Sequence, residues 1–361
     1  MVHQFKNNGY DIVLDVNSGA IHVVDDVTYD VIAMYEEHTK EEILAALSDK
    51  YSETEIREAM DEVEQLRENE ELFTEDVYEN HIIDFKKRPT VVKALCLHIA
   101  HDCNLACKYC FAEEGEYHGR RALMSYETGK QALDFLIANS GNRRNLEVDF
   151  FGGEPLLNFD VVKQLVAYGR EQEKLHDKHF RFTLTTNGVL LNDDIMEFAN
   201  KEMDNVVLSI DGRKEVHDHM RPFRKGAGSY DLIVPKFQKL ADSRNQERYY
   251  VRGTFTHYNT DFSKDVLHLA DLGFKQISVE PVVAEPKEPY AIREEDLPKL
   301  FEEYDKLAVE MIRRHKSGED FNFFHFMIDL EGGPCVAKRL SGCGSGTEYL
   351  AVTPWLSLIH I

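Results

Sequence analysis

The chain has 361 residues, of which 43% are hydrophobic and 30% are charged, and its formal net charge is −23. This acidic balance argues against a nucleic-acid-binding surface, which needs lysine and arginine for phosphate contacts, and against docking on an anionic membrane. The sequence contains neither an apolar run long enough to span a bilayer nor an N-terminal signal peptide, so we expect a soluble cytoplasmic protein.

Residues 1–75 predict a small α+β module that resembles a winged-helix domain. Two short β-rich runs lie within residues 2–24, separated by the turn signal Asn17-Ser18-Gly19. Three helices follow, at about 28–37, from Thr39 and from Ser52. Each of the last two begins with a hydroxyl residue three positions before a glutamate, which is the pattern of a capping box.

Charge also sets this region apart. Residues 1–90 carry −15 of the total charge, although they make up only a quarter of the chain. Such asymmetry favours a separate N-terminal module. Residues 76–90, acidic and then basic, are expected to form a linker.

From residue 91 to about 316, β-rich runs alternate with helical segments. The predicted strands cover 92–99, 146–151, 180–185, 206–210, 249–255 and 276–282. The predicted helices cover 125–139, 159–176, 193–201, 230–244, 264–272 and 294–315. Six β-α units imply parallel strands, because parallel neighbours need crossover connections. The pattern predicts an α/β fold, either an open doubly wound sheet or a partial barrel.

Small or polar clusters follow four consecutive predicted strands. They are Cys103–Cys110, Gly152-Gly153-Glu154-Pro155, Thr185–Gly188 and Ser209–Gly212. Since the carboxyl ends of parallel strands meet at one edge of the sheet, we expect one shared site there. An alternative for the third cluster, and for Asp211-Gly212, is that they form turns only.

Three of the six cysteines share one loop with the spacing C-x3-C-x2-C: Cys103, Cys107 and Cys110. Thiolates are the usual ligands of iron–sulfur clusters, and three of them leave one iron of a 4Fe–4S cube open. Zinc would need a fourth cysteine or histidine. His101 and His118 flank the loop, so a zinc site remains an alternative.

This cysteine loop, with an aromatic residue before its last cysteine, resembles the radical S-adenosylmethionine (SAM) superfamily. In that family the three cysteines bind a 4Fe–4S cluster, and its open iron chelates the methionine part of SAM. Gly-Gly-Glu-Pro resembles the motif that contacts the SAM amino group. The family fold is a partial (β/α)6 barrel of the TIM type, which agrees with six units. The cofactor-binding residues implied by the resemblance are Tyr109, Gly152, Gly153, Glu154, Asn187, Ser209, Asp211 and Arg221.

The C-terminal cysteines, Cys335 and Cys343, suggest a subfamily. Gly342–Gly346 and the segment 349–354 resemble the start of a SPASM domain, which carries auxiliary iron–sulfur clusters in peptide-modifying radical SAM enzymes. The resemblance implies that Cys343 and Cys335 are cluster ligands, over a region 317–355, and that further cysteines should follow.

Residues 356–361 do not continue the SPASM pattern and read like the translation of a transposon sequencing adapter. We therefore expect a non-native tail on a truncated chain. The alternative is a naturally short chain with an apolar end.

The N-terminal module, fused ahead of such an enzyme, resembles the recognition element of ribosomally made, modified peptides (RiPPs), which binds a precursor's leader as an added strand. The whole chain most resembles maturases of SCIFF peptides, oxidoreductases that join a cysteine sulfur of a cysteine-rich precursor to a carbon of an acceptor residue as a thioether. The resemblance further implies SAM, a SAM-binding 4Fe–4S cluster, auxiliary 4Fe–4S clusters, and a reductant such as flavodoxin or ferredoxin. An acidic module should prefer a leader that carries lysine or arginine, unless its charge serves only solubility.

Alternatives remain open at this point. Another radical SAM enzyme could form a carbon–carbon cross-link or epimerise a residue. A non-catalytic metal-binding protein that recognises peptides belongs to a different class. Of two further strand residues, Cys96 is expected to be a buried structural thiol, and Glu280 is a candidate for polar contact with SAM or substrate.

Overall fold

The computed structural model describes residues 1–79, 90–117, 119–328, 335, 344 and 346–356, with the backbone of 358–359. Among these residues the chain divides into two compact units, one drawn mainly from 1–79 and the other from 90–327 and 344–356. Each unit has a hydrophobic core of its own. No helix in the described ranges is long and apolar enough to cross a membrane.

The N-terminal unit is a three-stranded antiparallel sheet with three helices. The strands are β1 (Val2–Asn7), β2 (Tyr10–Asp15) and β3 (Ile21–Val24), in that order in the sheet. The helices are α1 (Asp26–Met34), α2 (Lys40–Leu47) and α3 (Glu53–Glu68). Both predicted capping boxes are present, on Thr39 and Ser52. Helix α1 begins earlier than predicted because the Asp25 carboxylate caps it by accepting from the Thr28 N–H.

The second unit is built on a ten-stranded sheet. Its strands are β4 (Ala94–His101), β5 (Ala122–Leu123), β6 (Asn145–Gly152), β7 (His179–Thr186), β8 (Asn205–Ser209), β9 (Tyr249–Phe255), β10 (Gln276–Pro281), β11 (Asn322–Phe323), β12 (Tyr349–Val352) and β13 (Leu358–Ile359). Its helices are α4 (Tyr126–Asn139), α5 (Phe159–His176), α6 (Asp193–Glu202), α7 (Lys214–Met220), α8 (Tyr230–Ser243), α9 (Ser263–Asp271) and α10 (Leu297–Ser317). Short 3-10 turns cover η2 (Pro155–Asn158), η3 (His257–Asn259), η4 (Glu294–Asp296) and η5 (Phe324–Phe326).

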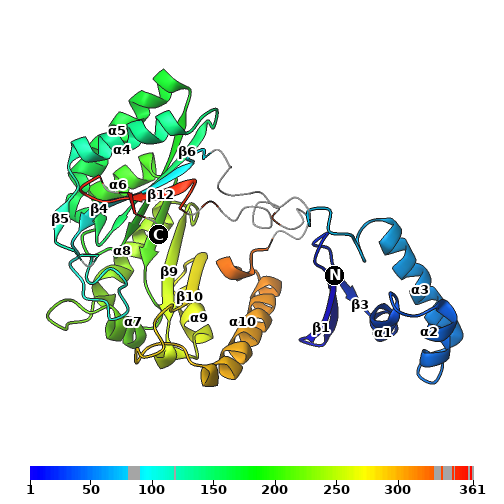
Figure 1. Ribbon diagram of the computed structural model, residues 1–361. Helices are drawn as coiled ribbons and strands as arrows, with labels where there is room; N and C mark the ends of the chain where they lie inside the picture. Colours follow the sequence, from blue (N-terminus) through cyan, green and yellow to red (C-terminus); the bar gives the residue numbers. More distant parts are fainter. Residues whose placement is uncertain are drawn as a thin grey trace. The chain divides into compact units, whose positions relative to one another are not determined.

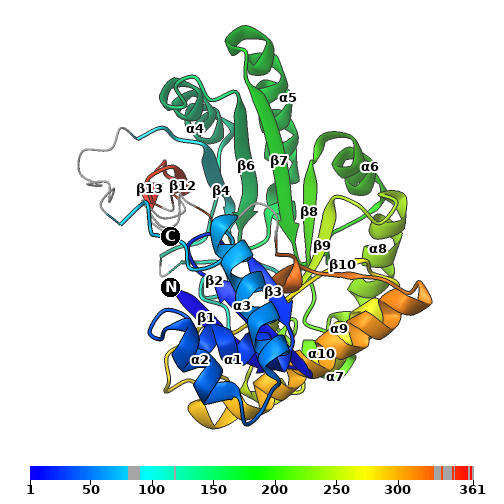
Figure 2. The same ribbon diagram turned by 90° about the vertical axis from the view of Figure 1, so that its right-hand side faces the viewer.

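The strand order is β11-β10-β9-β8-β7-β6-β4-β12-β13, with β5 paired to β4. All neighbours from β11 to β12 are parallel, and only β5 and β13 run antiparallel to their partners. Figures 1 and 2 show β4 and β6–β10 side by side with helices following the strands. The six β-α units and the unclosed strand path confirm the predicted α/β partial barrel.

Alternation along each strand separates an apolar face from a polar one. On β4, Leu95, Leu97 and Ile99 join the main hydrophobic core, while Cys96 and His98 point to the other side of the sheet. The polar side continues on the neighbouring strands, where the Tyr349 hydroxyl of β12 donates to Asp149 of β6 at 2.6 Å. This inner polar face leads up to the carboxyl ends of the strands.

Strand β12 and helix α7 are among the elements of this unit that were not predicted. Strand β12 lies beside β4, in register from Tyr349 with Ala94 to Val352 with Leu97, within a segment that the resemblance placed in the SPASM region. Its four residues are too short for a periodic signal, and its partner strand is some 250 residues earlier in the chain. Helix α7 was missed for a similar reason, because seven residues barely complete two turns.

Candidate active site

A cavity of about 350 Å³ opens at the carboxyl ends of β4 and β6–β10. Its lining brings together nine of the predicted site residues: Cys103, Cys107, Tyr109, Cys110, Gly152, Gly153, Asn187, Ser209 and Arg221. These residues come from four different strand-end loops and from the end of α7. The expected shared site at this edge of the sheet is therefore present as a single pocket.

The cysteine loop follows β4 and is fixed to the barrel by its backbone. The N–H groups of Ala106 and Lys108 donate to the carbonyls of Pro222 and Met220, both at 2.9 Å. The Cys103 thiol accepts weak bonds from Leu105 N–H at 3.5 Å and from Asn187 Nδ2 at 3.6 Å. Because these contacts hold the backbone, the loop presents its thiols to the pocket without a metal to organise it.

Burial controls the protonation of the Cys103 and Cys107 thiols. It raises the pKa of Cys103 to about 12 and that of Cys107 to about 11, with the Arg221 guanidinium opposing the rise at Cys107. Free thiols so situated hold their protons at neutral pH. A cation bound here must replace those protons, which is the usual coupling of metal binding to deprotonation.

Gly152 and Gly153 bring the end of β6 against the start of the cysteine loop. The Gly153 N–H donates to Ala100 O at 2.7 Å and the Glu154 N–H to Asp102 O at 2.9 Å. A Cβ on Gly153 would lie 2.1 Å from Asp102 O, and Gly152 has a φ of +121°. Only glycine allows this approach, and it leaves peptide backbone exposed in the pocket wall.

Glu154 differs from the expectation that its carboxylate faces the ligand. The side chain is fully buried and does not line the pocket. One oxygen accepts from Leu156 N–H and the Thr186 hydroxyl, and the other from Asn187 N–H, all within 3.0 Å. Burial raises its pKa to about 7, although these donors oppose the rise. Glu154 therefore ties the end of β6 to the end of β7 and acts on the pocket through Asn187.

Asp211 is likewise a buried anchor behind the pocket wall, where the resemblance implied contact with SAM. It accepts from the Tyr109 hydroxyl at 2.7 Å, from Arg221 Nε at 3.0 Å and from Thr254 N–H at 3.0 Å. The Arg221 guanidinium also lies over the Tyr109 ring, 5.3 Å from its centre. The carboxylate thus joins the cysteine loop, the end of α7 and strand β9 in one place.

Whether this site fits a cofactor can be judged from its buried polar atoms that lack a hydrogen-bond partner. Among the described residues five such side-chain atoms occur, and three of them lie in the segment 101–117 that contains the cysteine loop: His101 Nδ1, Asn104 Nδ2 and the Tyr117 hydroxyl. Unpaired buried polar atoms are costly, and their occurrence in the segment that carries three thiols fits a site that binds a further group. Thiol ligands together with such neighbours fit an iron–sulfur cluster with hydrogen bonds to its sulfurs.

The zinc alternative fits less well. Ligands of a single zinc ion must converge on one point at about 2.0–2.3 Å. In the part of the chain that the structure describes, no three histidine, cysteine, aspartate or glutamate side chains are grouped in that way. His101 instead faces His98, with His98 Nδ1 3.0 Å from His101 Nε2. His118, the other histidine considered, lies outside the described residues.

Two lining residues on β9 extend the site beyond the predicted set. Arg252 and Thr254 of β9 line the pocket, and Glu280 of β10, which the sequence had offered as a candidate, joins them. Arg252 Nη2 and Glu280 Oε2 are 2.7 Å apart. A charged residue at an inward position of an otherwise apolar predicted strand was the signal for Arg252.

The structure describes only one of the two C-terminal cysteines. Cys335 is a free, exposed thiol, and Cys343 lies outside the described residues. Their predicted role in an auxiliary cluster therefore stays a prediction.

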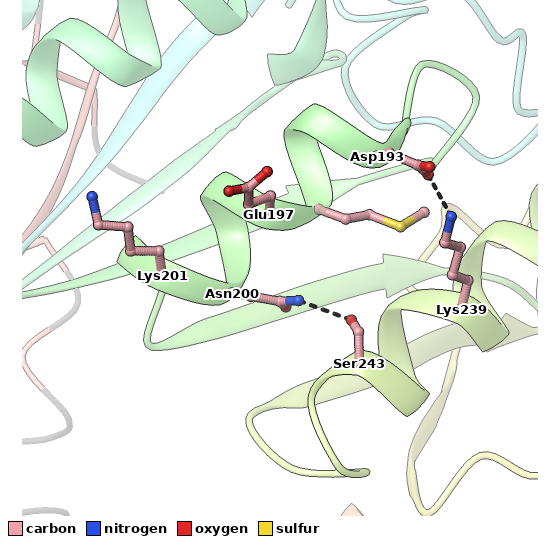
Figure 3. A pocket seen from close by; sticks show the side chains of 7 residues that line it. Asp193, Glu197, Asn200, Lys201, Lys239 and Ser243 are labelled. Atoms are coloured by element: carbon pink, nitrogen blue, oxygen red, sulfur yellow. Dashed lines mark hydrogen bonds and ion pairs between the residues drawn. The ribbon is translucent and has the colours of Figure 1, made fainter.

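A second depression lies between α6 and α8, away from the strand ends, and Figure 3 shows its side chains. Lys239 pairs there with Asp193 at 2.7 Å, and Asn200 Nδ2 donates to the Ser243 hydroxyl at 2.9 Å. Its polar groups bond one another across two helices. Nothing in this depression resembles the thiol-rich pocket, so the site is assigned to the strand ends.

Comparison with known sequences agrees with this placement. The profile of the radical SAM superfamily matches residues 97–272. An uncharacterized protein of Methanocaldococcus jannaschii is 31% identical over 224 residues, which cover 62% of this chain and 72% of that protein. The radical SAM cyclopropyl synthase TigE of Paramaledivibacter caminithermalis is 26% identical over 184 residues, 47% of this chain and 38% of that protein. The chain thus spans well under half of TigE.

Two solved structures share the fold. anSMEcpe with bound AdoMet and Cp18Cys peptide has a TM-score of 0.61 at 19% identity, over 75% of this chain and 74% of that chain. SuiB of Streptococcus suis bound to its precursor peptide SuiA has a TM-score of 0.53 at 12% identity, over 98% of this chain and 80% of that chain. At these identities the similarity establishes the architecture alone.

Proposed function

From the premise that the chain belongs to the radical SAM superfamily, we propose that it forms a thioether cross-link in a ribosomally made, cysteine-rich precursor peptide. The observation that carries the proposal is the convergence of three loop thiols with glycine backbone and polar strand-end side chains in one pocket. The peptide complexes of structural neighbours support a peptide substrate.

Cys103, Cys107 and Cys110 are the residues that would hold a 4Fe–4S cluster. With SAM bound and one electron from a reductant, such a cluster would supply a primary carbon radical able to remove a hydrogen atom from the substrate. The chain's own contribution is binding and orientation. Gly152 and Gly153 offer close backbone approach, and Asn187 and Ser209 offer polar side chains to a bound nucleotide.

Behind these contacts, Glu154 and Asp211 fix the strand ends, so that the polar groups are held in place before a ligand arrives. Phe151, Val282 and Val283 are apolar residues of the pocket lining. Apolar lining beside a radical site excludes water and limits side reactions. The paired Arg252 and Glu280 also line the pocket and could contact a polar group of a peptide.

The N-terminal unit is proposed to bind the leader of the precursor. Strand β3 pairs only with β2 among the described residues, so its outer edge carries unused hydrogen-bonding groups. Ile21 and Val23 on this strand are 41% and 64% exposed. An extended leader could add to such an edge through backbone bonds, with apolar side chains meeting these two residues.

The test is anaerobic reconstitution with iron and sulfide, followed by SAM, a reductant and any short cysteine-rich peptide found encoded beside the gene. We expect 5′-deoxyadenosine and a peptide that has lost two hydrogen atoms and one alkylatable thiol. Replacing Cys103, Cys107 and Cys110 by alanine should abolish both products. Cys96→Ala is the matched control and should keep SAM cleavage, because Cys96 lies in β4 outside the pocket.

The same assay separates the alternatives. A carbon–carbon cross-link also removes two hydrogen atoms but leaves every thiol open to alkylation. Epimerisation leaves the mass unchanged. A protein that binds metal and peptide without catalysis would yield no 5′-deoxyadenosine, and that result would refute the proposed function.

A further inference from the structure

A fully buried histidine on helix α7 connects two loops behind the pocket wall. Neither His217 nor its partner Ser229, which is also fully buried, lines the pocket. The Asp211 N–H lies 3.3 Å from His217 Nδ1, and His217 Nε2 lies 2.9 Å from the Ser229 hydroxyl. That hydroxyl in turn lies 2.8 Å from the Arg221 carbonyl oxygen. One imidazole therefore links the loop after β8 to the segment that follows α7.

The partners fix the direction of every hydrogen bond in this chain. A backbone N–H can only donate, so His217 Nδ1 accepts from Asp211 and the imidazole proton is on Nε2. A carbonyl can only accept, so the Ser229 hydroxyl donates to Arg221 and accepts from His217 Nε2. Burial lowers the pKa of His217 to about 4, which agrees with the neutral imidazole that this pattern requires.

The chain closes into a ring because Asp211 and Arg221 are also joined directly. The Asp211 carboxylate lies 3.0 Å from Arg221 Nε. Arg221 is thus held at its guanidinium by Asp211 and at its carbonyl by Ser229, and its own N–H donates to the His217 carbonyl at 2.7 Å. Of the four residues in the ring, Arg221 alone lines the pocket, together with Cys107.

Holding an arginine in place before a ligand arrives changes what binding costs. A free arginine side chain loses rotamer freedom when it binds a ligand, whereas one that is already fixed does not. The bond to Asp211 uses one of the five N–H donors of the Arg221 guanidinium. A guanidinium fixed in this way suits a carboxylate such as that of the methionine part of SAM.

We propose that His217 and Ser229 are positioning residues for SAM, because the ring fixes the Arg221 guanidinium in the pocket wall and so strengthens SAM binding. The inference rests on the proposed function. It adds two residues that do not line the pocket and that act on it only through Arg221.

The chain offers a matched pair of buried serines for the test. Ser229 and Ser140 are both fully buried, and each hydroxyl donates to a backbone carbonyl at 2.8 Å, that of Ser140 to Ile137 at the end of α4. Ser140 does not line the pocket. Ser229→Ala and Ser140→Ala should therefore lower the urea midpoint of the iron-free chain similarly. Only Ser229→Ala should weaken SAM binding to the cluster-loaded protein, by roughly tenfold.

Each other result of this comparison has a defined meaning. Equal SAM affinity in wild type and Ser229→Ala would overturn the proposal. Equal weakening in both variants would overturn it too, because the serines would then act through stability alone. If Ser229→Ala took up no cluster while Ser140→Ala did, the ring would hold the cysteine loop rather than SAM, and the proposal would also fail. A wild-type cluster that binds no SAM would refute the proposed function and this inference with it.

A second variant tests whether the ring acts as one unit. In His217→Asn the side chain keeps an acceptor at the position of Nδ1 but is too short to reach Ser229. We expect weaker SAM binding in this variant. In the double variant with Ser229→Ala, the loss of affinity should be smaller than the product of the two single losses, because both changes break the same bond. Losses that multiply would mean that the two residues act independently and would contradict the closed ring.

Discussion

Tyr109 and Asp211 are 102 positions apart in the sequence, and the Tyr109 hydroxyl lies 2.7 Å from both carboxylate oxygens of Asp211. Tyr109 belongs to the cysteine loop and Asp211 follows strand β8. Their contact fixes the thiol-bearing loop to the barrel independently of any bound metal. Arg221, 3.0 Å from the same carboxylate, completes a buried charged network.

Asp211→Asn should destabilise the iron-free chain more than Tyr109→Phe does. The first change leaves the buried Arg221 without its counter-ion, at a cost of about 3 kcal/mol, whereas the second removes one hydrogen bond to a charged group, worth about 1.5 kcal/mol. Urea unfolding of both variants measures the difference. A larger loss of unfolding free energy in Tyr109→Phe than in Asp211→Asn would contradict this description of the network.

Glu154→Gln should weaken SAM binding at least tenfold although Glu154 does not line the pocket. A glutamine places an amide donor against the Leu156, Asn187 or Thr186 donors that now bond the carboxylate, and the end of β7 must shift. Equilibrium binding to the cluster-loaded protein checks this. Glu171→Gln, at an exposed position of α5, is the control and should bind SAM normally. Normal binding by Glu154→Gln would contradict a positioning role.

Gly153→Ala should abolish SAM binding, because the new Cβ would lie 2.1 Å from the Asp102 carbonyl oxygen and neither backbone can give way. Gly226→Ala provides the comparison. Gly226 has a positive φ, of +84°, but no atom within 4 Å of a new Cβ, so the change should cost about 1 kcal/mol of backbone strain and leave binding intact. Equal SAM binding by the Gly153→Ala and Gly226→Ala variants would contradict the role of crowding at the end of β6.

Glu303 should give the fold a pH-dependent stability. Its carboxylate is buried on α10, yet bonds from Lys306, Ser263 and Lys299 outweigh the burial and lower its pKa to about 2 from 4.5. A carboxylate whose pKa is lower in the folded chain than in the unfolded chain stabilises the fold at pH values above the unfolded pKa. This contribution is lost as the pH falls from 4.5 towards 2.

Glu303→Gln should therefore be less stable than wild type by about 3 kcal/mol near pH 7, from roughly 1.4 kcal/mol for each pKa unit. The difference in unfolding free energy between wild type and Glu303→Gln should become smaller as unfolding is measured at successively lower pH. A gap that stays constant down to about pH 3 would mean that the Glu303 charge does not contribute as described.

Leader binding by the N-terminal unit should weaken as salt increases. Residues 1–90 carry −15, so a leader with lysine or arginine gains attraction that salt screens over about 10 Å at 0.1 M. Fluorescence anisotropy of a labelled leader at low and high salt measures the effect. Unchanged affinity would indicate that the acidic helices serve solubility only.

The sequence was most informative where a structural signal is local. The six strands of the α/β unit were predicted from β-rich runs, and the N-terminal helix starts at Thr39 and Ser52 from capping boxes that the structure contains. Both signals depend on neighbours within a few positions. The pocket could be placed because parallel strands bring their carboxyl ends to one edge.

What could not be predicted depends on distant partners. Glu154 turns away from the pocket because donors on β7, more than thirty residues later, satisfy its carboxylate. Strand β12 pairs with β4 across most of the chain.

The most direct test of the account is the electron paramagnetic resonance spectrum of the reduced, reconstituted protein before and after SAM is added. Three cysteine ligands leave one iron open, so we predict that SAM changes the signal of the cluster and that alanine at Cys103, Cys107 and Cys110 removes the signal. A cluster spectrum that is identical with and without SAM would contradict the central claim.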